Sequence, residues 1–196
     1  MKLVNCSKKY KDKCVFSGIN YEFVGGIWHL KGANGTGKSV FCRCLLGLED
    51  FDSGEVIGRG KNVLYLPDTA LGEDWLSMSE NIDLLLYYYN IAMNDDEKFE
   101  IMDKLKITEP NKNFSLLSVG TAMKLGMFLL FIKNKWDLIV LDEASSHLDV
   151  EVKNIILNEL EFRAREGCNI IIVEHGLKTM DSNVWKKIEL EKIHGK

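Results

Sequence analysis

The hydrophobic pattern of the chain alternates between short continuous apolar runs and segments with helical spacing. The apolar runs are bounded by turn residues and predict buried strands, over residues 26–31, 62–66, 138–141 and 169–173. Helical spacing predicts a short helix over 40–47 that stops at Gly47, and a second over 122–133. Strands that alternate with helices are typical of an α/β fold with a mainly parallel sheet.

The pattern changes near the N-terminus and in the middle of the chain. Residues 2–30 predict short strands with turns, with candidates at 15–16 and 19–24, as in an antiparallel β subdomain. Residues 71–113 have helical spacing, which predicts a small helical insert. The polar tail, 185–196, predicts an edge strand and a frayed end.

We therefore expect a single domain in two parts. Residues 1–67 and 134–196 form the core together with the antiparallel β subdomain, and residues 68–133 form the helical subdomain. The insert contains three leucines and three tyrosines in a row, residues 84–89, which are apolar nearly all round the helix. Core packing and a contact surface for a partner both account for this run.

Composition narrows the function classes. The chain has 196 residues, of which 46% are hydrophobic and 28% charged, and its net charge is −4. This balance is ordinary for a soluble globular domain and gives no overall electrostatic reason to expect nucleic acid or an anionic membrane as a partner. The apolar runs are too short to span a bilayer, and the first residues lack the apolar run of a signal peptide. We expect a cytoplasmic chain that reaches a membrane through another chain.

The five cysteines have no spacing typical of a disulfide framework or a metal site. Reduced thiols in the core are the expected state.

The strongest chemical signal is the segment 32–39, Gly-Ala-Asn-Gly-Thr-Gly-Lys-Ser, called here the phosphate loop. Gly35 and Gly37 allow the backbone to turn its N–H groups toward phosphates. Lys38 supplies a positive charge for the β- and γ-phosphates, and Ser39 offers a hydroxyl to Mg²⁺. A predicted strand precedes the loop and a predicted helix follows it, as nucleotide binding requires; the alternative is a glycine-rich turn with a chance Lys-Ser pair.

A second signal is the acidic pair Asp142 and Glu143 at the end of the predicted strand 138–141. Ligands of open α/β sheets lie at the carboxyl ends of the strands. Asp142 is placed to hold Mg²⁺, and Glu143 to polarise the water that attacks the γ-phosphate. A helix-capping acidic pair is the alternative. His175 follows another predicted strand and is a candidate γ-phosphate contact.

The segment 134–137, Asn-Lys-Trp-Asp, matches the guanine-reading motif of GTPases. In those proteins the motif follows a buried strand, whereas here it precedes one. The sequence also lacks an Asp-x-x-Gly segment, so GTPase is not the favoured function.

Taken together and in order, these segments resemble the ATP-binding cassette (ABC) family over essentially the whole chain. Leu-Ser-Val-Gly-Thr at 117–121, the signature segment, resembles Leu-Ser-Gly-Gly-Gln, and Ser-His-Leu-Asp at 146–149 resembles the D-loop. Tyr10 matches the adenine-stacking aromatic residue, Asp68 the glutamine-loop position and His175 the switch histidine. From the residues alone, Tyr10 is equally well explained as an exposed loop tyrosine.

The resemblance implies an ATPase that binds ATP and Mg²⁺ and pairs head to tail with a second ABC subunit, identical or different. Glu143, His175 and Lys38 are the implied catalytic residues, and Ser39, Asp142 and Asp68 the implied metal ligands. The implied nucleotide-binding residues are Tyr10, Gly32, Ala33, Asn34, Gly35, Thr36, Gly37, Lys38, Ser39 and Val40, with Ser118 and Gly120 supplied by the partner copy.

In transporters of this family the closing and opening of the dimer drives a transmembrane partner. We expect such a partner here, near Asp68 and the helix at 84–89, with export slightly favoured over import. Two other functions stay open. One is a soluble ABC ATPase that acts on the ribosome or nucleic acid, which usually carries two cassettes. The other is a regulatory nucleotide-binding module with little turnover.

The chain departs from the family pattern at several positions. Asp68 stands in place of glutamine, Val119 and Thr121 replace a glycine and a glutamine of the signature, and Ala144 follows Glu143 where proline is usual. A β-branched Val119 is expected to restrict the backbone near a phosphate. These departures predict weaker or partner-dependent ATPase activity.

Overall fold

The computed structural model describes residues 1–11, 13–174 and 183–190. The chain divides into two compact units, each described here by itself. The first comprises Met1–Tyr65, Lys135–Glu143 and Glu161–Lys196, and the second Leu66–Asn134 and Ala144–Leu160.

The first unit contains two sheets. The five-stranded sheet has the order β5-β6-β7-β3-β8, and the pairs β3–β7, β3–β8 and β6–β7 are parallel. Its strands are β3 (Gly26–Lys31), β5 (Val63–Leu66), β6 (Leu138–Asp142), β7 (Asn169–Val173) and β8 (Trp185–Glu189). The three-stranded antiparallel sheet, β2-β1-β4, consists of β1 (Lys2–Tyr10), β2 (Lys13–Glu22) and β4 (Ser53–Ile57). The predicted α/β fold with an N-terminal antiparallel sheet is confirmed.

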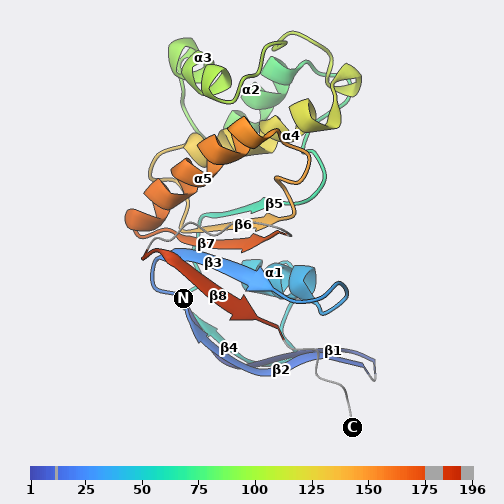
Figure 1. The fold of residues 1–196 in the computed structure, drawn as a ribbon, viewed down its shortest axis with the longest axis vertical. Coiled ribbons are helices and arrows are strands. Elements are labelled where there is room, and N and C mark those ends of the chain that lie inside the picture. The colour runs from blue at the N-terminus through green and yellow to red at the C-terminus, as the bar shows by residue number, and fades with distance from the viewer. Residues whose placement is uncertain (12, 175–182, 191–196) are drawn as a thin grey trace. The chain divides into compact units, whose positions relative to one another are not determined.

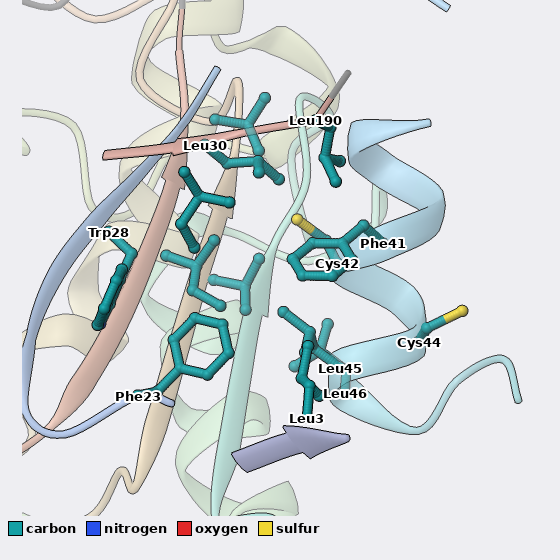
Figure 2. Packing of buried hydrophobic residues seen from close by; sticks show 14 of the residues in the cluster. Leu3, Phe23, Trp28, Leu30, Phe41, Cys42, Cys44, Leu45, Leu46 and Leu190 are labelled. Carbon is teal, nitrogen blue, oxygen red and sulfur yellow. The ribbon is translucent and has the colours of Figure 1, made fainter. Parts of the chain in front are cut away.

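Helix α1 (Lys38–Leu46) organises the core of this unit (Figure 1). Its side chains Phe41, Cys42 and Leu45 are buried in one cluster with residues of both sheets, including Leu3 of β1 and Leu30 of β3 (Figure 2). In Figure 2, Cys42 points toward the strands while Cys44 points away from them. Burial of this apolar helix face holds the N-terminus of α1 in place at the end of β3.

Two sequence predictions for the N-terminal strands are corrected. The candidates at 15–16 and 19–24 form one strand, β2, that continues through Gly18. Gly18 has φ of 64°, and the pairing of β1 with β2 shifts register in several places. A glycine in the left-handed region lets a strand bulge and continue, so this glycine does not end the strand as a turn would.

The second unit is helical. Its helices are α2 (Met78–Tyr88), α3 (Asp95–Lys104), α4 (Val119–Phe128) and the start of α5 (Val150–Arg165), with short 3₁₀ turns at Phe114–Leu116 and Leu129–Phe131. Ser77 and Glu80 form a capping box at the start of α2, and Asn94 and Glu97 form another at the start of α3. These boxes satisfy backbone N–H groups that would otherwise lack partners, and they fix where each helix begins.

Helix α4 begins before residue 122, the first residue of its predicted range, and ends before residue 133, the last. The Ser118 side chain accepts a hydrogen bond from the Thr121 N–H, so the helix starts at Val119. At the other end the chain tightens into the 3₁₀ turn Leu129–Phe131. The signature segment therefore forms the first turn of a helix.

At the C-terminal side, β8 lies at the edge of the five-stranded sheet, as predicted for the start of the tail. The rest of that prediction, at 191–196, lies outside the described residues. All five cysteines are free thiols, and all except the half-buried Cys14 are buried, as expected for reduced core residues. Within residues 1–11, 13–174 and 183–190, no helix has both the length and the apolar character to cross a bilayer.

Candidate active site

The phosphate loop joins β3 to α1, as its sequence predicts. Gly37 has φ of 94° and stands at the N-cap position of α1. A Cβ added there would lie 2.2 Å from Cγ1 of Val15 on β2, so close packing and the left-handed backbone both require glycine. Gly35 has φ of 76°, but a Cβ there would meet only open space. The loop therefore needs Gly35 and Gly37 for different reasons.

Lys38 is buried against the loop that it follows. Its Nζ donates to the carbonyl oxygens of Gly32 and Ala33, at 2.9 and 3.1 Å. The hydroxyl of Thr36 donates to the same Ala33 oxygen at 2.9 Å. Since only 8% of Lys38 is exposed, an ammonium group is held at the centre of the loop by neutral oxygens. A negatively charged group is the natural additional partner for such a cation.

The N-terminus of α1 also suits an anion. Among the described residues, no side chain caps this helix end. The first N–H groups of a helix are polar donors at the positive end of its dipole, so they bind phosphate groups well. Ser39 lies in this first turn and is half-buried. The loop, Lys38 and the helix end together fit the phosphates of a nucleotide.

The acidic pair lies at the carboxyl end of β6. Asp142, the last residue of the strand, is only 7% exposed. Glu143 follows it with φ of 57°, and its N–H donates to the Val173 carbonyl oxygen at 2.8 Å. A non-glycine residue in the left-handed region is strained, and such strain is concentrated at functional sites. Asp142 and Glu143 thus lie at the carboxyl end of a strand of the parallel sheet, where the sequence predicts them.

Tyr65 contacts Asp142, and the sequence did not predict Tyr65 as a site residue. Its hydroxyl donates to Oδ2 of Asp142 at 3.2 Å. Burial, followed by the Asp142 charge, raises the pKa of Tyr65, so the hydroxyl keeps its proton. Burial likewise raises the pKa of the Cys42 thiol on α1 well above its usual value, with a further contribution from Asp142. The only sequence signal for Tyr65 is a phenol in an otherwise apolar strand.

His29 is a second residue that sequence reasoning missed. It lies on β3 and is almost fully buried, with Nε2 3.0 Å from the Glu174 carbonyl oxygen. Burial lowers the pKa of His29, and the nearby Lys31 and Lys187 act in the same direction. The candidate γ-phosphate contact His175 lies outside the described residues, so its predicted role stays a prediction.

Tyr10 lies at the end of β1 and is 45% exposed. Its hydroxyl donates to Glu49 at 2.5 Å, and the other oxygen of Glu49 accepts from Nε of Arg43 on α1 at 2.8 Å. The hydrogen bonds from Tyr10 and Arg43 lower the pKa of Glu49. These contacts orient the Tyr10 ring from the helix that begins at the phosphate loop. Its predicted stacking on adenine stays a prediction.

The remaining predicted site residues belong to the second unit. Ser118 caps α4, and its hydroxyl lies 2.8 Å from that of Thr121. A Cβ added to Gly120 would lie 2.6 Å from the backbone oxygen of His147 in the D-loop-like segment. Val119 is the first residue of α4, so its backbone is helical. Its side chain is 59% exposed. Asp68 is exposed directly after Pro67.

The apolar run at 84–89 is buried on one side of α2 and exposed on the other. Leu86 is buried in the second unit, whereas Leu84, Tyr87 and Tyr88 are exposed on α2. Core packing therefore explains one side of the helix, and the exposed aromatic rings give the other side an apolar surface.

The Asn-Lys-Trp-Asp segment has a structural role at its last residue. Oδ2 of Asp137 accepts hydrogen bonds from the N–H groups of Lys61 and Asn62, at 2.8 and 2.9 Å. The carboxylate therefore secures the turn that leads into β5.

The family model for ABC transporters matches residues 19–146, which include the phosphate loop, the signature segment and the acidic pair. The chain belongs to the ABC transporter family. It is an ATP-binding subunit of such a transporter, and membership of the family implies ATP hydrolysis. The resemblance inferred from the ordered motifs is confirmed.

Similar proteins agree with this assignment. The chain is 33% identical, over 92% of its length and 70% of the other, to an uncharacterised ABC transporter ATP-binding protein of Methanocaldococcus jannaschii. It is 31% identical to a zinc import ATP-binding protein of Rickettsia prowazekii, over 91% of this ABC subunit and 77% of that protein. It is 25% identical to a methionine import ATP-binding protein of Bartonella henselae, of which it spans 58%.

A solved structure shares the fold. A putative ABC transporter ATP-binding protein of Pyrococcus furiosus superposes with a TM-score of 0.78 at 20% identity, covering 95% of this chain and 96% of that one. At this identity the likeness supports the fold of the ABC subunit and nothing further.

Proposed function

We propose that this ABC subunit hydrolyses Mg-ATP and thereby powers the translocation of a substrate through a transmembrane partner. Lys38 and the N–H groups at the start of α1 bind the β- and γ-phosphates. Gly32, Ala33, Asn34, Gly35, Thr36, Gly37 and Val40 complete the binding loop, and Tyr10 stacks on the adenine ring.

Ser39 and Asp142 hold Mg²⁺ in this proposal, with Asp68 as a further ligand. Hydroxyl and carboxylate oxygens are the ligands that Mg²⁺ prefers, which supports the assignment. When bound, the ion neutralises charge that develops on the transferred phosphoryl group. Glu143 accepts a proton from the attacking water, and His175 contacts the γ-phosphate.

A second ABC subunit completes the site. Ser118 and Gly120 of that subunit contact the γ-phosphate, so ATP holds the two copies together and hydrolysis releases them. The membrane partner docks on the surface that contains Leu84, Tyr87 and Tyr88, where large apolar rings lie exposed. This partner would hold the subunit at the cytoplasmic face of the membrane.

The direction of transport, export or import, is a separate part of the proposal. The expectation from the sequence slightly favours export. Similar proteins carry names of both kinds, such as zinc import in Rickettsia prowazekii and Nod factor export in Rhizobium etli. Transport assays in both orientations of reconstituted vesicles decide between them.

The observation that carries the proposal is the buried Lys38 ammonium, which donates to loop carbonyl oxygens at the start of α1. A cation and several helix N–H groups that converge on one point form a phosphate site. Removing the Glu143 carboxylate tests the chemistry beyond binding.

The variant Glu143→Gln is expected to bind Mg-ATP with wild-type affinity and to lose turnover by about 100-fold or more, because a general base is removed. Calorimetry measures the binding, and phosphate release measures the turnover. Glu166→Gln changes an exposed glutamate directly after α5; it is the matched control and should keep wild-type turnover. A Glu143→Gln protein that hydrolyses ATP at the wild-type rate contradicts the assigned role.

A regulatory module with little turnover is the second candidate. It is favoured by the exposed Val119 in the signature segment and by Asp68 in place of glutamine. Such a module would bind ATP and its partner without stimulated hydrolysis, so ATPase assays with and without native membranes separate the two. Association with ribosomes or DNA in fractionated cells would instead favour a soluble ABC ATPase.

A further inference from the structure

A side-chain hydrogen bond links β5 to the first residue of the acidic pair. Tyr65, near the end of β5, donates a hydrogen bond from its hydroxyl to Oδ2 of Asp142 at 3.2 Å. Strand β5 lies next to β6 in the sheet, so the two residues belong to neighbouring strands of the first unit. Asp142 is buried and Tyr65 is half-buried, which makes the contact part of the interior.

This contact leaves the two carboxylate oxygens in different situations. Oδ2 accepts a hydrogen bond from a phenol that approaches from β5, which restricts rotation of the carboxylate plane. Oδ1 is then left in a defined direction for a cation or its bound water. Hydrogen bonds of this kind to a ligating side chain orient it and tune its affinity for metal.

We propose that Tyr65 is a positioning residue for the magnesium-binding carboxylate of Asp142. The inference rests on the proposed function, since it needs Asp142 to hold Mg²⁺ when ATP is bound. Tyr65 does not touch nucleotide in this account; it acts through Asp142. Its contribution is therefore a difference between ATP binding with Mg²⁺ and ATP binding without it.

The test is the affinity for ATP, measured by calorimetry in EDTA and in MgCl₂. Glu143→Gln serves as the background so that ATP stays intact. Tyr65→Phe keeps the ring and removes only the hydroxyl. We expect unchanged affinity in EDTA and a Mg²⁺-dependent gain in affinity that is smaller by about two- to tenfold, the effect of losing one hydrogen bond.

Two controls separate positioning from a general structural effect. Tyr21→Phe changes another partly buried tyrosine of the first unit, whose ring packs against Phe23 and Trp28, and should leave both affinities unchanged. In an Asp142→Ala background, Tyr65→Phe should have no further effect on the Mg²⁺-dependent gain, because the residue through which it acts is gone.

Each alternative result has a clear meaning. An equal Mg²⁺-dependent gain with and without the Tyr65 hydroxyl would overturn the inference, as would an equal loss of affinity in EDTA and MgCl₂. If the Glu143→Gln background itself shows no Mg²⁺-dependent gain, the proposed magnesium site is wrong and the role of Tyr65 fails with it.

Discussion

The phosphate loop and the signature segment both depend on glycine, but for different physical reasons. In the phosphate loop, Gly37 combines a left-handed backbone with contact against Val15. In the signature segment, Gly120 is an ordinary helical residue that needs space beside the His147 carbonyl oxygen. Its neighbour Val119 faces outward, and the backbone accepts a β-branched side chain there.

This difference explains which departure from the family pattern the fold tolerates. A glycine required by its φ angle, or by a backbone atom within 3 Å of its Cβ position, cannot be replaced without a local shift. A glycine at an exposed helical position can be replaced at little structural cost. The valine at 119 therefore affects what approaches the signature segment from outside, and the fold of the second unit is unaffected.

The largest effect in this comparison is expected for Gly37→Ala. The new Cβ would collide with Val15 and the backbone would keep a left-handed angle, which alone costs about 1–2 kcal/mol. With the clash added, we expect a loss of at least about 3 kcal/mol in the free energy of unfolding, measured by urea denaturation of the ATP-free protein.

Gly35→Ala is the matched control, because its φ is also positive but its Cβ position is open. It should lose only the conformational part, about 1–2 kcal/mol. Equal losses for the two variants would show that packing against β2 is not what requires Gly37.

A smaller effect is expected for Gly120→Ala. Here the backbone angle is ordinary, and the cost comes from moving the His147 carbonyl away from the new methyl group. We expect a loss of about 1–3 kcal/mol in the free energy of unfolding. Val119→Gly, one residue earlier and exposed, should change stability by no more than about 1 kcal/mol. The comparison would break if Val119→Gly destabilised the protein more than Gly120→Ala did.

The smallest effect is a pH dependence that arises in the first unit. His29 is buried with a pKa below its usual 6.5, so below that pH the unfolded chain takes up a proton that the folded chain does not. Stability should therefore fall as the pH drops from about 6.5 toward the lower folded pKa. Lys31, Lys187 and Glu174 are the charged groups that act on His29.

The thermal midpoint between pH 7.5 and pH 5 measures this effect. His29→Gln should flatten the pH dependence, whereas His147→Gln, an exposed histidine in the second unit, should leave it as in the wild type. If the thermal midpoint of both variants fell with pH as steeply as that of the wild type, other groups would account for the fall in stability.

The sequence predicts most of the first unit because its signals are local. The strand 26–31, the glycines of the phosphate loop and the stop at Gly47 follow one another within about twenty residues, and each has one physical meaning. The pattern predicts two strands where β2 is one, because the continuation through Gly18 depends on the pairing of β2 with β1. Local pattern does not contain the register of a neighbouring strand.

The missed site residues depend on distant parts of the chain. Tyr65 meets Asp142 only because β5 and β6 are neighbours in the sheet, and His29 meets the Glu174 carbonyl oxygen only because β3 and β7 are neighbours. The helix α4 starts at Val119 because the Ser118 side chain caps it, whereas the pattern predicts a start at residue 122. The Ser118 cap is a local signal, and the contact of Ser118 with phosphate stays a prediction.

The most direct test of the central claim is the molar mass of Glu143→Gln by light scattering, with and without Mg-ATP. The account predicts a monomer without nucleotide and a dimer with Mg-ATP, because blocked hydrolysis traps two copies around ATP despite Val119. Ser118→Arg in the same background should bind ATP and stay monomeric. A Glu143→Gln protein that is saturated with Mg-ATP and remains a monomer would contradict an ATP-driven dimer of this chain with itself.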